Sequence, residues 1–368
     1  MVLESIEASV LAIPFKSAFK HASATRSVTQ TIWVRARASD GSVGFGEGCP
    51  REYVTGESLN SARAFIAART SHWLHEIRDA ATLGVWVRGH AHEIDASPAA
   101  WAAVELALLD LLGKAAKVPV ESLLGLPALC GRFRYTAVIG DAAPGDFERQ
   151  LDHYRQAGFR DFKIKLAGEH DRDAAKVRSL RVSGIAPDGV RADANNLWSD
   201  ADTAIEDLTS LGYAFGAIEE PLRAGDIDGM ARIRRARACR IVLDESVTKK
   251  EDVAKVSAES EHWLVNLRVS KMGGLLRALD FLEQARRTGI RIIVGAHVGE
   301  TSLLTRAALT VAHAAGTALV AQEGAFGTHL LMHDVIDVPL MFGAGGILDV
   351  DASAIGAAPG WGLPITNA

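Results

Sequence analysis

The chain has 368 residues, of which 48% are hydrophobic and 23% are charged, and its formal net charge is -5. This balance is ordinary for a folded protein with a sizeable core. The mild negative charge disfavours nucleic acid and anionic membranes as partners. The length predicts two domains, or one barrel with an added module.

The first 125 residues alternate in the manner of a small α+β domain. Pro98 follows Ser97 at the start of an apolar helical segment, so Ser97 is the expected N-cap. The glycine-rich run 44–48 follows a hairpin signal and has no helix after it, so we interpret it as a turn and not as a phosphate loop. We expect strands over 4–13 and 30–38, irregular loops over 21–27 and 50–56, and helices over 58–78 and 98–116.

The next 200 residues alternate between short aliphatic runs and helical patterns. Such runs are typical of buried parallel strands; they lie at 161–165, 190–193, 217–219, 240–244, 263–267, 291–294 and 317–320. Helical patterns at 200–211, 277–288 and 301–315 separate them. We therefore predict a (β/α) barrel over 126–325, an α+β capping domain over 1–125, and a C-terminal segment, 326–368, that packs back on the capping domain.

Ionisable residues recur at the ends of these predicted strands, about 25 to 28 residues apart, which is the length of one strand, one helix and two short loops. The carboxyl ends of barrel strands meet at one mouth, where catalytic groups lie. The series is Lys165, Asp193, Glu219, Asp244, Lys271, His297 and Glu323.

The chemistry of this series is that of metal-assisted proton transfer. Asp193, Glu219 and Asp244 are three carboxylates on adjacent strand ends, which suits Mg²⁺ or Mn²⁺. A cation there would neutralise charge that develops when a proton leaves the carbon next to a bound carboxylate. Lys163 and Lys165 share one face of their strand, and two neighbouring ammonium groups favour loss of a proton from one of them. Lys271, from the opposite side of the ring, would face Lys165 as its acid/base partner.

Five motifs then resemble the muconate-lactonizing-enzyme subgroup of the enolase superfamily. They are Lys163-Ile-Lys165, Asp193-Ala-Asn195, Ile218-Glu-Glu-Pro221, Leu243-Asp-Glu-Ser246 and Lys271-Met-Gly-Gly274. The resemblance implies a modified TIM barrel under an N-terminal cap, Mg²⁺ at the three carboxylates, and acid/base work by Lys165 and Lys271 with Lys163 in support. It also implies a small-molecule carboxylate substrate and a homo-oligomer. Asn195 and Glu220 are expected beside the metal ligands, and Glu220 is a departure from the family's Glu-Gln-Pro motif.

Substrate identity depends on other positions. Dipeptide epimerases of this family carry an Asp-x-Asp pair at the eighth strand to hold the substrate ammonium, and the pair is absent from Ala321–Thr328 here. Glu323 with the following Phe-Gly instead resembles muconate cycloisomerases. His297 stands where mandelate racemases have a catalytic histidine, and we expect it to face the substrate. Arg51 and Tyr53, on the cap loop 50–56, are expected to gate the site.

Three functions remain open. The leading one is Mg²⁺-dependent racemisation or epimerisation at the α-carbon of an amino-acid-derived carboxylate, through an enolate. The alternative is a cycloisomerase or syn-dehydratase on the same scaffold, with a single lysine transferring the proton. The remote alternative is a non-catalytic barrel that only binds a ligand, which has no need of three carboxylates and two lysines.

The cysteines and the apolar segments favour a cytoplasmic protein. Three cysteines without CxxC spacing favour a reduced setting over a disulfide framework. The N-terminus alternates instead of carrying a basic and then apolar signal. The most apolar helix, 99–112, contains Glu105 and Asp110 and is too short to span a bilayer.

Overall fold

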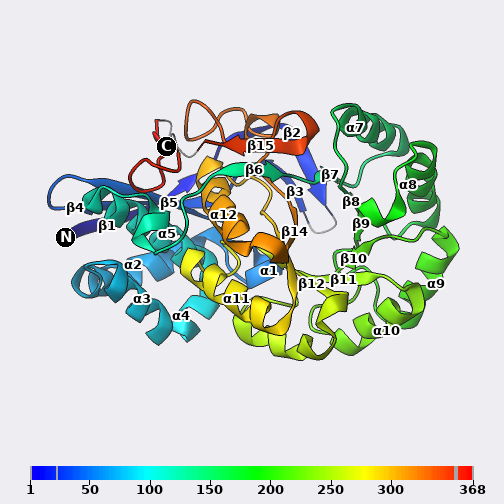
Figure 1. The fold of residues 1–368 in the computed structure, drawn as a ribbon, viewed down its shortest axis with the longest axis horizontal. Helices are drawn as coiled ribbons and strands as arrows, with labels where there is room; N and C mark the ends of the chain where they lie inside the picture. The colour runs from blue at the N-terminus through cyan, green and yellow to red at the C-terminus, as the bar shows by residue number, and fades with distance from the viewer. Residues whose placement is uncertain (1, 22–23, 352–354, 367–368) are drawn as a thin grey trace.

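The computed structural model describes residues 2–21, 24–351 and 355–366. Figure 1 shows most of the first third of the chain on one side of the molecule and a ring of strands enclosed by helices on the other. The C-terminal segment returns to the side of the first third. The predicted fold class, an α/β barrel with an N-terminal α+β cap, is confirmed.

The cap is built on an antiparallel sheet in the order β1-β4-β5, and β2 pairs with β3 in a separate hairpin. The strands are β1 (Leu3–Leu11), β2 (Pro14–His21), β3 (Ala24–Val28), β4 (Thr31–Ala38) and β5 (Val43–Gly48). The β2–β3 hairpin takes the place of the irregular loop predicted over 21–27. Its strands carry several basic and small residues and lack the sustained apolar alternation that signals a strand. Residues 22–23 lie outside the described part.

The cap helices are α1 (Glu52–Thr55), α2 (Leu59–Glu76), α3 (Ala80–Gly89), α4 (Ala91–Ala96), α5 (Pro98–Ala116) and α6 (Val120–Leu123). Helix α5 has the predicted bounds and is buried along nearly its whole length. Ser97 takes the predicted N-cap position before Pro98, but its side chain makes no capping hydrogen bond. The carboxylate of Glu57 instead accepts from the amides of Ala99 and Ala100.

Strand β5 lies against helix α5 at backbone distance. A Cβ added at Gly44, Gly46 or Gly48 would lie 2.0 to 2.2 Å from the carbonyl oxygens of Ala107, Ala103 and Ala99. The two-residue period of a strand face and the four-residue spacing of a helix face coincide here. The glycine run is therefore a packing surface within a strand, neither a turn nor a phosphate loop.

Eight parallel strands form the barrel sheet in sequential order. They are β7 (Ala137–Ile139), β8 (Phe162–Lys165), β9 (Val190–Asp193), β10 (Ala217–Glu219), β11 (Arg240–Leu243), β12 (Trp263–Leu267), β13 (Arg291–Val294) and β14 (Leu319–Gln322). A hydrogen bond of 2.8 Å from the Thr136 amide to the Gln322 carbonyl joins the two ends of the sheet.

The barrel interior shows which side chains point inward. Five buried residues from consecutive strands form a cluster separate from the main core: Ala217, Val242, Leu264, Ile293 and Ala321. Because side chains alternate along a strand, the residues two and four positions later face the same interior. Alternation therefore identifies which side chains at the barrel mouth face inward, which the spacing between ionisable residues along the chain does not.

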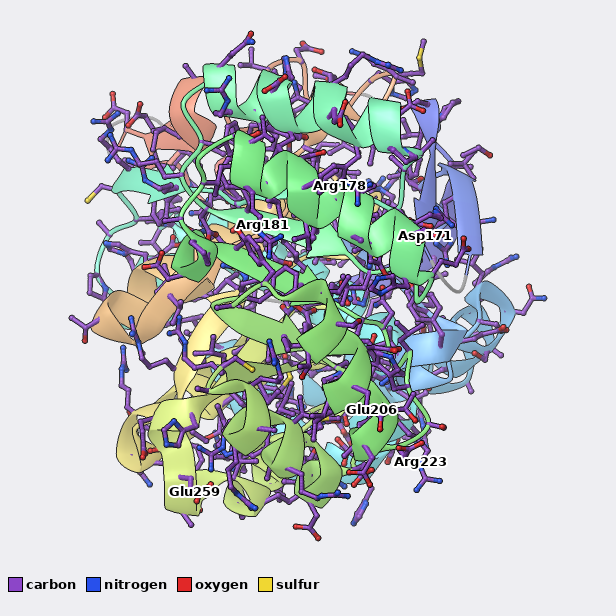
Figure 2. The ribbon with its side chains drawn as sticks, turned by 90° about the vertical axis from the view of Figure 1, so that its right-hand side faces the viewer. Asp171, Arg178, Arg181, Glu206, Arg223 and Glu259 are labelled. Carbon is purple, nitrogen blue, oxygen red and sulfur yellow. The ribbon has the colours of Figure 1, made fainter. Side chains whose placement is uncertain are left out.

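The barrel helices are α7 (Pro144–Gln156), α8 (His170–Val182), α9 (Ala201–Leu211), α10 (Ile227–Arg237), α11 (Leu275–Thr288) and α12 (Ser302–Ala315). Two 3-10 helices, Lys250–Lys255 and Ser257–His262, stand between β11 and β12. Figure 2 shows charged side chains of both signs, among them Asp171, Arg178 and Glu206, on the outer helices α8 and α9. Among the described residues, no helix combines the length and the hydropathy that a membrane span needs.

The C-terminal segment contacts both the cap and the start of the barrel. Strand β15 (Ile347–Val350) pairs with β6 (Gly131–Arg134). Trp361 donates its indole N–H to the Leu106 carbonyl of α5 at 3.0 Å. The segment also pairs with β2, through the Lys16 amide and the Leu330 carbonyl.

Three buried cap carboxylates dock on barrel helices. Glu47 accepts from the amide and hydroxyl of Thr301, at the start of α12. Glu105 accepts from the Leu276 amide, at the start of α11, at 2.9 Å. Glu121 makes two parallel hydrogen bonds with Arg306 in α12, at 2.7 and 2.8 Å. Carboxylates at helix N-termini are stabilised by the free amides there, so these contacts fix the cap over the barrel.

Candidate active site

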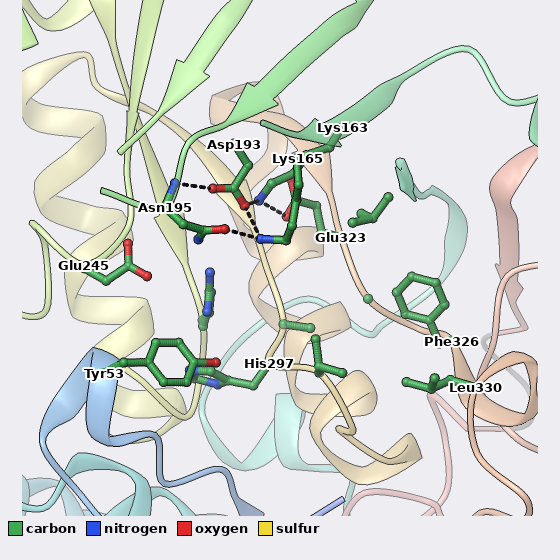
Figure 3. Close-up of a pocket in the computed structure, with 15 residues that line it drawn as sticks. Tyr53, Lys163, Lys165, Asp193, Asn195, Glu245, His297, Glu323, Phe326 and Leu330 are labelled. Atoms are coloured by element: carbon green, nitrogen blue, oxygen red, sulfur yellow. Dashed lines mark hydrogen bonds and ion pairs between the residues drawn. The ribbon is translucent and has the colours of Figure 1, made fainter. Parts of the chain in front are cut away.

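The carboxyl ends of the barrel strands bring most of the predicted residues together. Lys165 pairs in register with Asp193, and Asp193 pairs with Glu219, so these three are neighbours around the ring. Asp244 follows directly after β11, two residues beyond the inward Val242. Figure 3 shows Lys163, Lys165, Asp193 and Glu323 close together.

A cavity lies between this cluster and the cap. Its volume of about 110 Å³ is several times the roughly 10–15 Å³ that one ordered water needs. Polar and apolar side chains share the lining: Tyr53, Val138, Lys163, Lys165, Asp193, Asn195, Glu245, Arg268, Ala296, His297, Val298, Glu323, Gly324, Phe326 and Leu330. A cavity with this mixed lining suits a small polar molecule.

Lys163 is the hub of a buried ionic network. Its Nζ lies 2.7 Å from Glu219, 3.0 Å from Glu323 and 3.3 Å from Asp193. Burial lowers the pKa of Lys163, but the three carboxylates outweigh burial, so its pKa is raised. Among these three carboxylates Lys163 is held as an ammonium.

Lys165 faces the cavity and contacts the strand next to it. Its Nζ donates to Asp193 Oδ2 at 2.9 Å and to the amide oxygen of Asn195. Asn195 has a φ of 47°, and its backbone N–H donates a hydrogen bond to Asp193 Oδ1, which holds the residue in place. Burial raises the pKa of Asp193, but Lys163 and Lys165 outweigh burial and lower it, so this carboxylate is ionised.

The three predicted metal ligands are buried beside four cations. Arg268 contacts Asp244 closely and lies 4.0 Å from Glu219 Oε1. Among the described residues, the potential metal ligands whose donor atoms all lie within 4.8 Å of one another are Cys49, His297 and Glu300, and not the three predicted carboxylates. Burial raises the pKa of the Cys49 thiol well above its ordinary value, which makes it a poor ligand.

The carboxylate set nevertheless fits a hard divalent cation. Three buried carboxylates on the adjacent strands β9, β10 and β11 are the oxygen donors that Mg²⁺ takes. Their charge is balanced here by lysine and arginine side chains. For the three to gather around one ion, Arg268 has to leave Asp244.

Lys271 does not lie at the barrel mouth, where the regular spacing of the ionisable residues predicts it. Its Nζ donates to the Asp244 carbonyl at 2.7 Å, to Asp244 Oδ1 at 3.0 Å and to the Asn266 carbonyl at 2.7 Å. These bonds use its three hydrogens, and Lys271 is absent from the described residues that line the cavity. Burial lowers the pKa of Lys271 to about 7, with Arg268 adding to the effect, but the amine does not line the cavity.

The cation that does face the cavity from β12 is Arg268. Leu264 points inward, so alternation brings Asn266 and then Arg268 to the same side. Lys271 lies three residues further, in the turn before α11. The sequence-based pairing of Lys165 with Lys271 is corrected by this geometry, since strand direction and not stride decides which residue reaches the mouth.

Glu323 is held by two cations. Its Oε1 accepts from Arg191 at 3.1 Å and its Oε2 accepts from Lys163 at 3.0 Å. Arg191 was not predicted, although it precedes Asp193 by two residues on the inward face of β9. Glu323 therefore lines the cavity with both oxygens already engaged.

Of the two cap residues predicted to contact the substrate, one lines the cavity and the other does not. Tyr53, in α1, lines the cavity. Arg51 does not appear among the described lining residues: its guanidinium donates to the carbonyls of Gln30, Pro50 and Val298. This corrects the expectation for Arg51, because a buried guanidinium with carbonyl partners ties the loop down instead of meeting a ligand.

His297 lines the cavity on the side of Tyr53 (Figure 3). Neither ring nitrogen has a hydrogen-bond partner in the described residues, and Nδ1 lies 3.4 Å from Glu300. Burial, followed by the charge of Arg268, lowers the pKa of His297 well below its ordinary value. The imidazole is therefore neutral and available for a polar contact.

Glu220 holds the turn that carries Asp244, one of the predicted metal ligands. Its Oε1 accepts from the amides of Asp244 and Ser246, both at 2.7 Å, and so fixes the turn after β11. Burial raises the pKa of Glu220 to about 7. Burial also raises the pKa of Glu245 to about 8, and this carboxyl, which was not predicted, lines the cavity.

Comparison with known proteins places this site in a family. Residues 5–125 match the mandelate racemase / muconate lactonizing enzyme N-terminal domain, and residues 146–368 match the enolase C-terminal domain-like family. The chain is 27% identical to an N-succinyl-L-Arg/Lys racemase of Bacillus cereus, covering 85% of this chain and 84% of the relative. It is 28% identical to a chloromuconate cycloisomerase of Cupriavidus pinatubonensis, with the same two coverages.

A solved structure of similar fold is a dipeptide epimerase from Methylococcus capsulatus complexed with Mg and the dipeptide L-Arg-D-Lys. It has a TM-score of 0.82 and 28% identity, and the match covers 99% of both chains. Racemases, epimerases and cycloisomerases of this kind are all isomerases of one superfamily. The chain therefore belongs to the mandelate racemase/muconate lactonizing enzyme family of the enolase superfamily.

Proposed function

We propose that this isomerase removes the α-proton of a small carboxylate substrate with Lys165 as the base, next to a divalent metal ion held by Asp193, Glu219 and Asp244. The observation that carries the proposal is the position of Lys165. Its amine lies in the cavity, 2.9 Å from a carboxylate of the ligand set. A base and a cation site this close together can act on one substrate, the base on its α-proton and the cation on its carboxylate.

The metal would be Mg²⁺, with Mn²⁺ as a substitute, since both prefer carboxylate oxygens. When bound, the cation neutralises the negative charge that develops on the substrate carboxylate as the α-proton leaves. Lys163 holds Asp193 and Glu219 in place. Asn195 orients the Lys165 amine, and Glu220 holds the turn that carries Asp244.

The cavity supports a substrate without a free ammonium group. Glu323 is the carboxylate that β14 offers, and Arg191 and Lys163 already neutralise it. Burial and the neighbouring carboxylates raise the pKa of Glu245, so this carboxyl holds its proton more tightly than a free one does. N-acylated amino acids, such as the substrates named for the Bacillus cereus relative, and muconate-type acids fit this better than dipeptides do.

Two outcomes of the shared first step are to be compared. Racemisation needs a second proton donor on the face opposite Lys165. Cycloisomerisation needs one base only, and the placement of Arg268 where Lys271 was expected favours this second candidate.

The test is α-proton exchange in D₂O with Mg²⁺, followed by mass spectrometry over N-succinyl amino acids, dipeptides and muconates. Deuterium uptake or conversion is expected in one class, and chelation of the metal should abolish it. Lys165→Ala should lose the activity by at least the roughly 10²–10⁴-fold that a general base contributes. Full activity in a correctly folded Lys165→Ala variant would refute the assignment of the base.

A further inference from the structure

Two cationic side chains face each other across the cavity. Lys165 ends β8 and Arg268 follows β12, and these strands are four positions apart in the sheet of eight. Each contacts one end of the ligand set, Lys165 at Asp193 and Arg268 at Asp244. A carboxylate bound at that set would have its α-carbon between them.

The two cations differ in what they can do to a proton. A lysine amine, once neutral, accepts a proton and returns it. A guanidinium stays protonated in proteins and offers only donors, arranged as a planar fork that matches a carboxylate. Arg268 is therefore suited to holding an anion and not to moving a proton.

Lys271 and His297 do not supply a second base beside Arg268. Lys271 donates to two carbonyls and a carboxylate and is turned from the cavity. His297 lies with Tyr53 at the other end of the cavity from Lys165 and Asp193, as Figure 3 shows. No contact joins His297 to the three carboxylates among the described residues.

The Arg268 guanidinium also has a hydrogen-bond donor that is not in use. Its Nε is buried without a hydrogen-bond partner in the described residues. Its ion pairs go to Asp244 and Glu219, which are the carboxylates that a divalent cation would take. Once these oxygens serve the cation, the guanidinium needs another anion, and the cavity is the space next to it.

We propose that the enzyme moves protons on the Lys165 face alone, and that Arg268 holds a second anionic group of the substrate on the opposite face. This inference rests on the proposed function. It assigns the reaction to the cycloisomerase type, in which a ring carboxylate is expelled from, or added to, the carbon β to the metal-bound carboxylate.

The step balances without a co-reactant. In ring opening, Lys165 takes the α-proton and the C–H electron pair forms the enolate. The enolate pair then forms the Cα–Cβ double bond, and the Cβ–O bond breaks with its electron pair on oxygen. The released carboxylate lies against Arg268, and the proton passes from Lys165 to water. Ring closure is the reverse.

The first test compares the wild type with Arg268→Lys on N-succinyl-L-arginine and N-succinyl-D-arginine, separately, in D₂O with Mg²⁺. The α-proton signal and chiral chromatography are followed. The wild type should exchange at most one enantiomer and should not invert it. Arg268→Lys places an amine on the second face, so exchange of the other enantiomer and inversion should appear at least tenfold above wild type. Arg268→Met is the matched control and should gain neither.

The second test does not depend on turnover. Calorimetry with the Mg²⁺-loaded protein should show succinate binding weakened at least tenfold by Arg268→Met, and acetate binding changed much less. Inversion by the wild type, or an equal loss for both anions, would overturn the inference while leaving Lys165 as the base. Absence of exchange and of conversion with every probe class, muconate included, would instead overturn the proposed function.

Discussion

Glu121→Gln should strongly destabilise the protein, because it removes one charge from a fully buried ion pair between cap and barrel. Glu121 and Arg306 are 1% and 0% exposed. The guanidinium makes two bonds to the carboxylate, and the hydroxyl of Thr310 donates to the same carboxylate at 2.6 Å. After the substitution the Arg306 charge remains buried without an opposite charge.

Breaking a buried pair on one side costs about 3–5 kcal/mol. A loss of about 4 kcal/mol lowers the ratio of folded to unfolded protein by roughly a thousandfold. Removing both charges, as in Glu121→Met with Arg306→Met, should cost less than Glu121→Gln alone, because no uncompensated charge is left.

The assay is urea unfolding followed by tryptophan fluorescence and by circular dichroism. Trp361 is a local reporter, since the Arg306 guanidinium lies 5.5 Å from its ring centroid. A loss below about 1 kcal/mol for Glu121→Gln, or a double variant less stable than both single variants, would refute the reasoning.

The same pair predicts a dependence on pH. Burial raises the pKa of Glu121, but the hydrogen bonds and charge of Arg306 outweigh burial and lower it. A carboxyl with a lowered pKa in the folded state stabilises the protein above its unfolded pKa, about 4.3, and loses this contribution as the pH falls. The difference in stability between wild type and Glu121→Gln should therefore narrow below about pH 4.

Three further substitutions test separate parts of the structure. Gly46→Ala would place a methyl group 2.0 Å from the Ala103 carbonyl oxygen and should cost at least about 1–3 kcal/mol in urea unfolding, whereas Gly89→Ala, with open space around it, should change stability by no more than about 1 kcal/mol. Asp193→Asn should abolish the rise in melting temperature that Mg²⁺ gives the wild type, which corresponds to about 2.7 kcal/mol at one hundred times the dissociation constant; an unchanged rise would exclude this ligand. Lys271→Met should cost about 1–3 kcal/mol for each carbonyl left without a donor, and unaltered urea unfolding would contradict the bonding described for this amine.

The barrel was predictable from the sequence because the aliphatic runs and the ionisable residues that follow them recur with the same spacing. Short aliphatic runs recur at the spacing of a βα unit, and the ionisable residue after each run lies at one mouth. The same spacing misled at β12. It selected Lys271, although the strand ends at Leu267 and Arg268 follows it directly. Alternation from the inward-facing Leu264 leads to Arg268 instead.

Other features depend on contacts between distant residues. The Ser-Pro signal located the N-cap residue of α5 at Ser97, but the carboxylate that accepts from the first amides belongs to Glu57, about forty residues earlier. Arg51 and Tyr53 lie on one loop, yet carbonyl partners turn the arginine away from the cavity. Residue type does not reveal such directions, because neighbouring loops and not the local sequence supply the partners.

The central claim is that three carboxylates hold a metal ion between Lys165 and Arg268. Crystals grown with Mn²⁺ and succinate, examined by anomalous scattering, test it most directly. We predict one manganese peak bound by Asp193, Glu219 and Asp244, with Arg268 moved from Asp244 to the carboxylate of succinate. A manganese ion at Cys49, His297 and Glu300, or an Arg268 that stays on Asp244 beside the bound ion, would contradict the account.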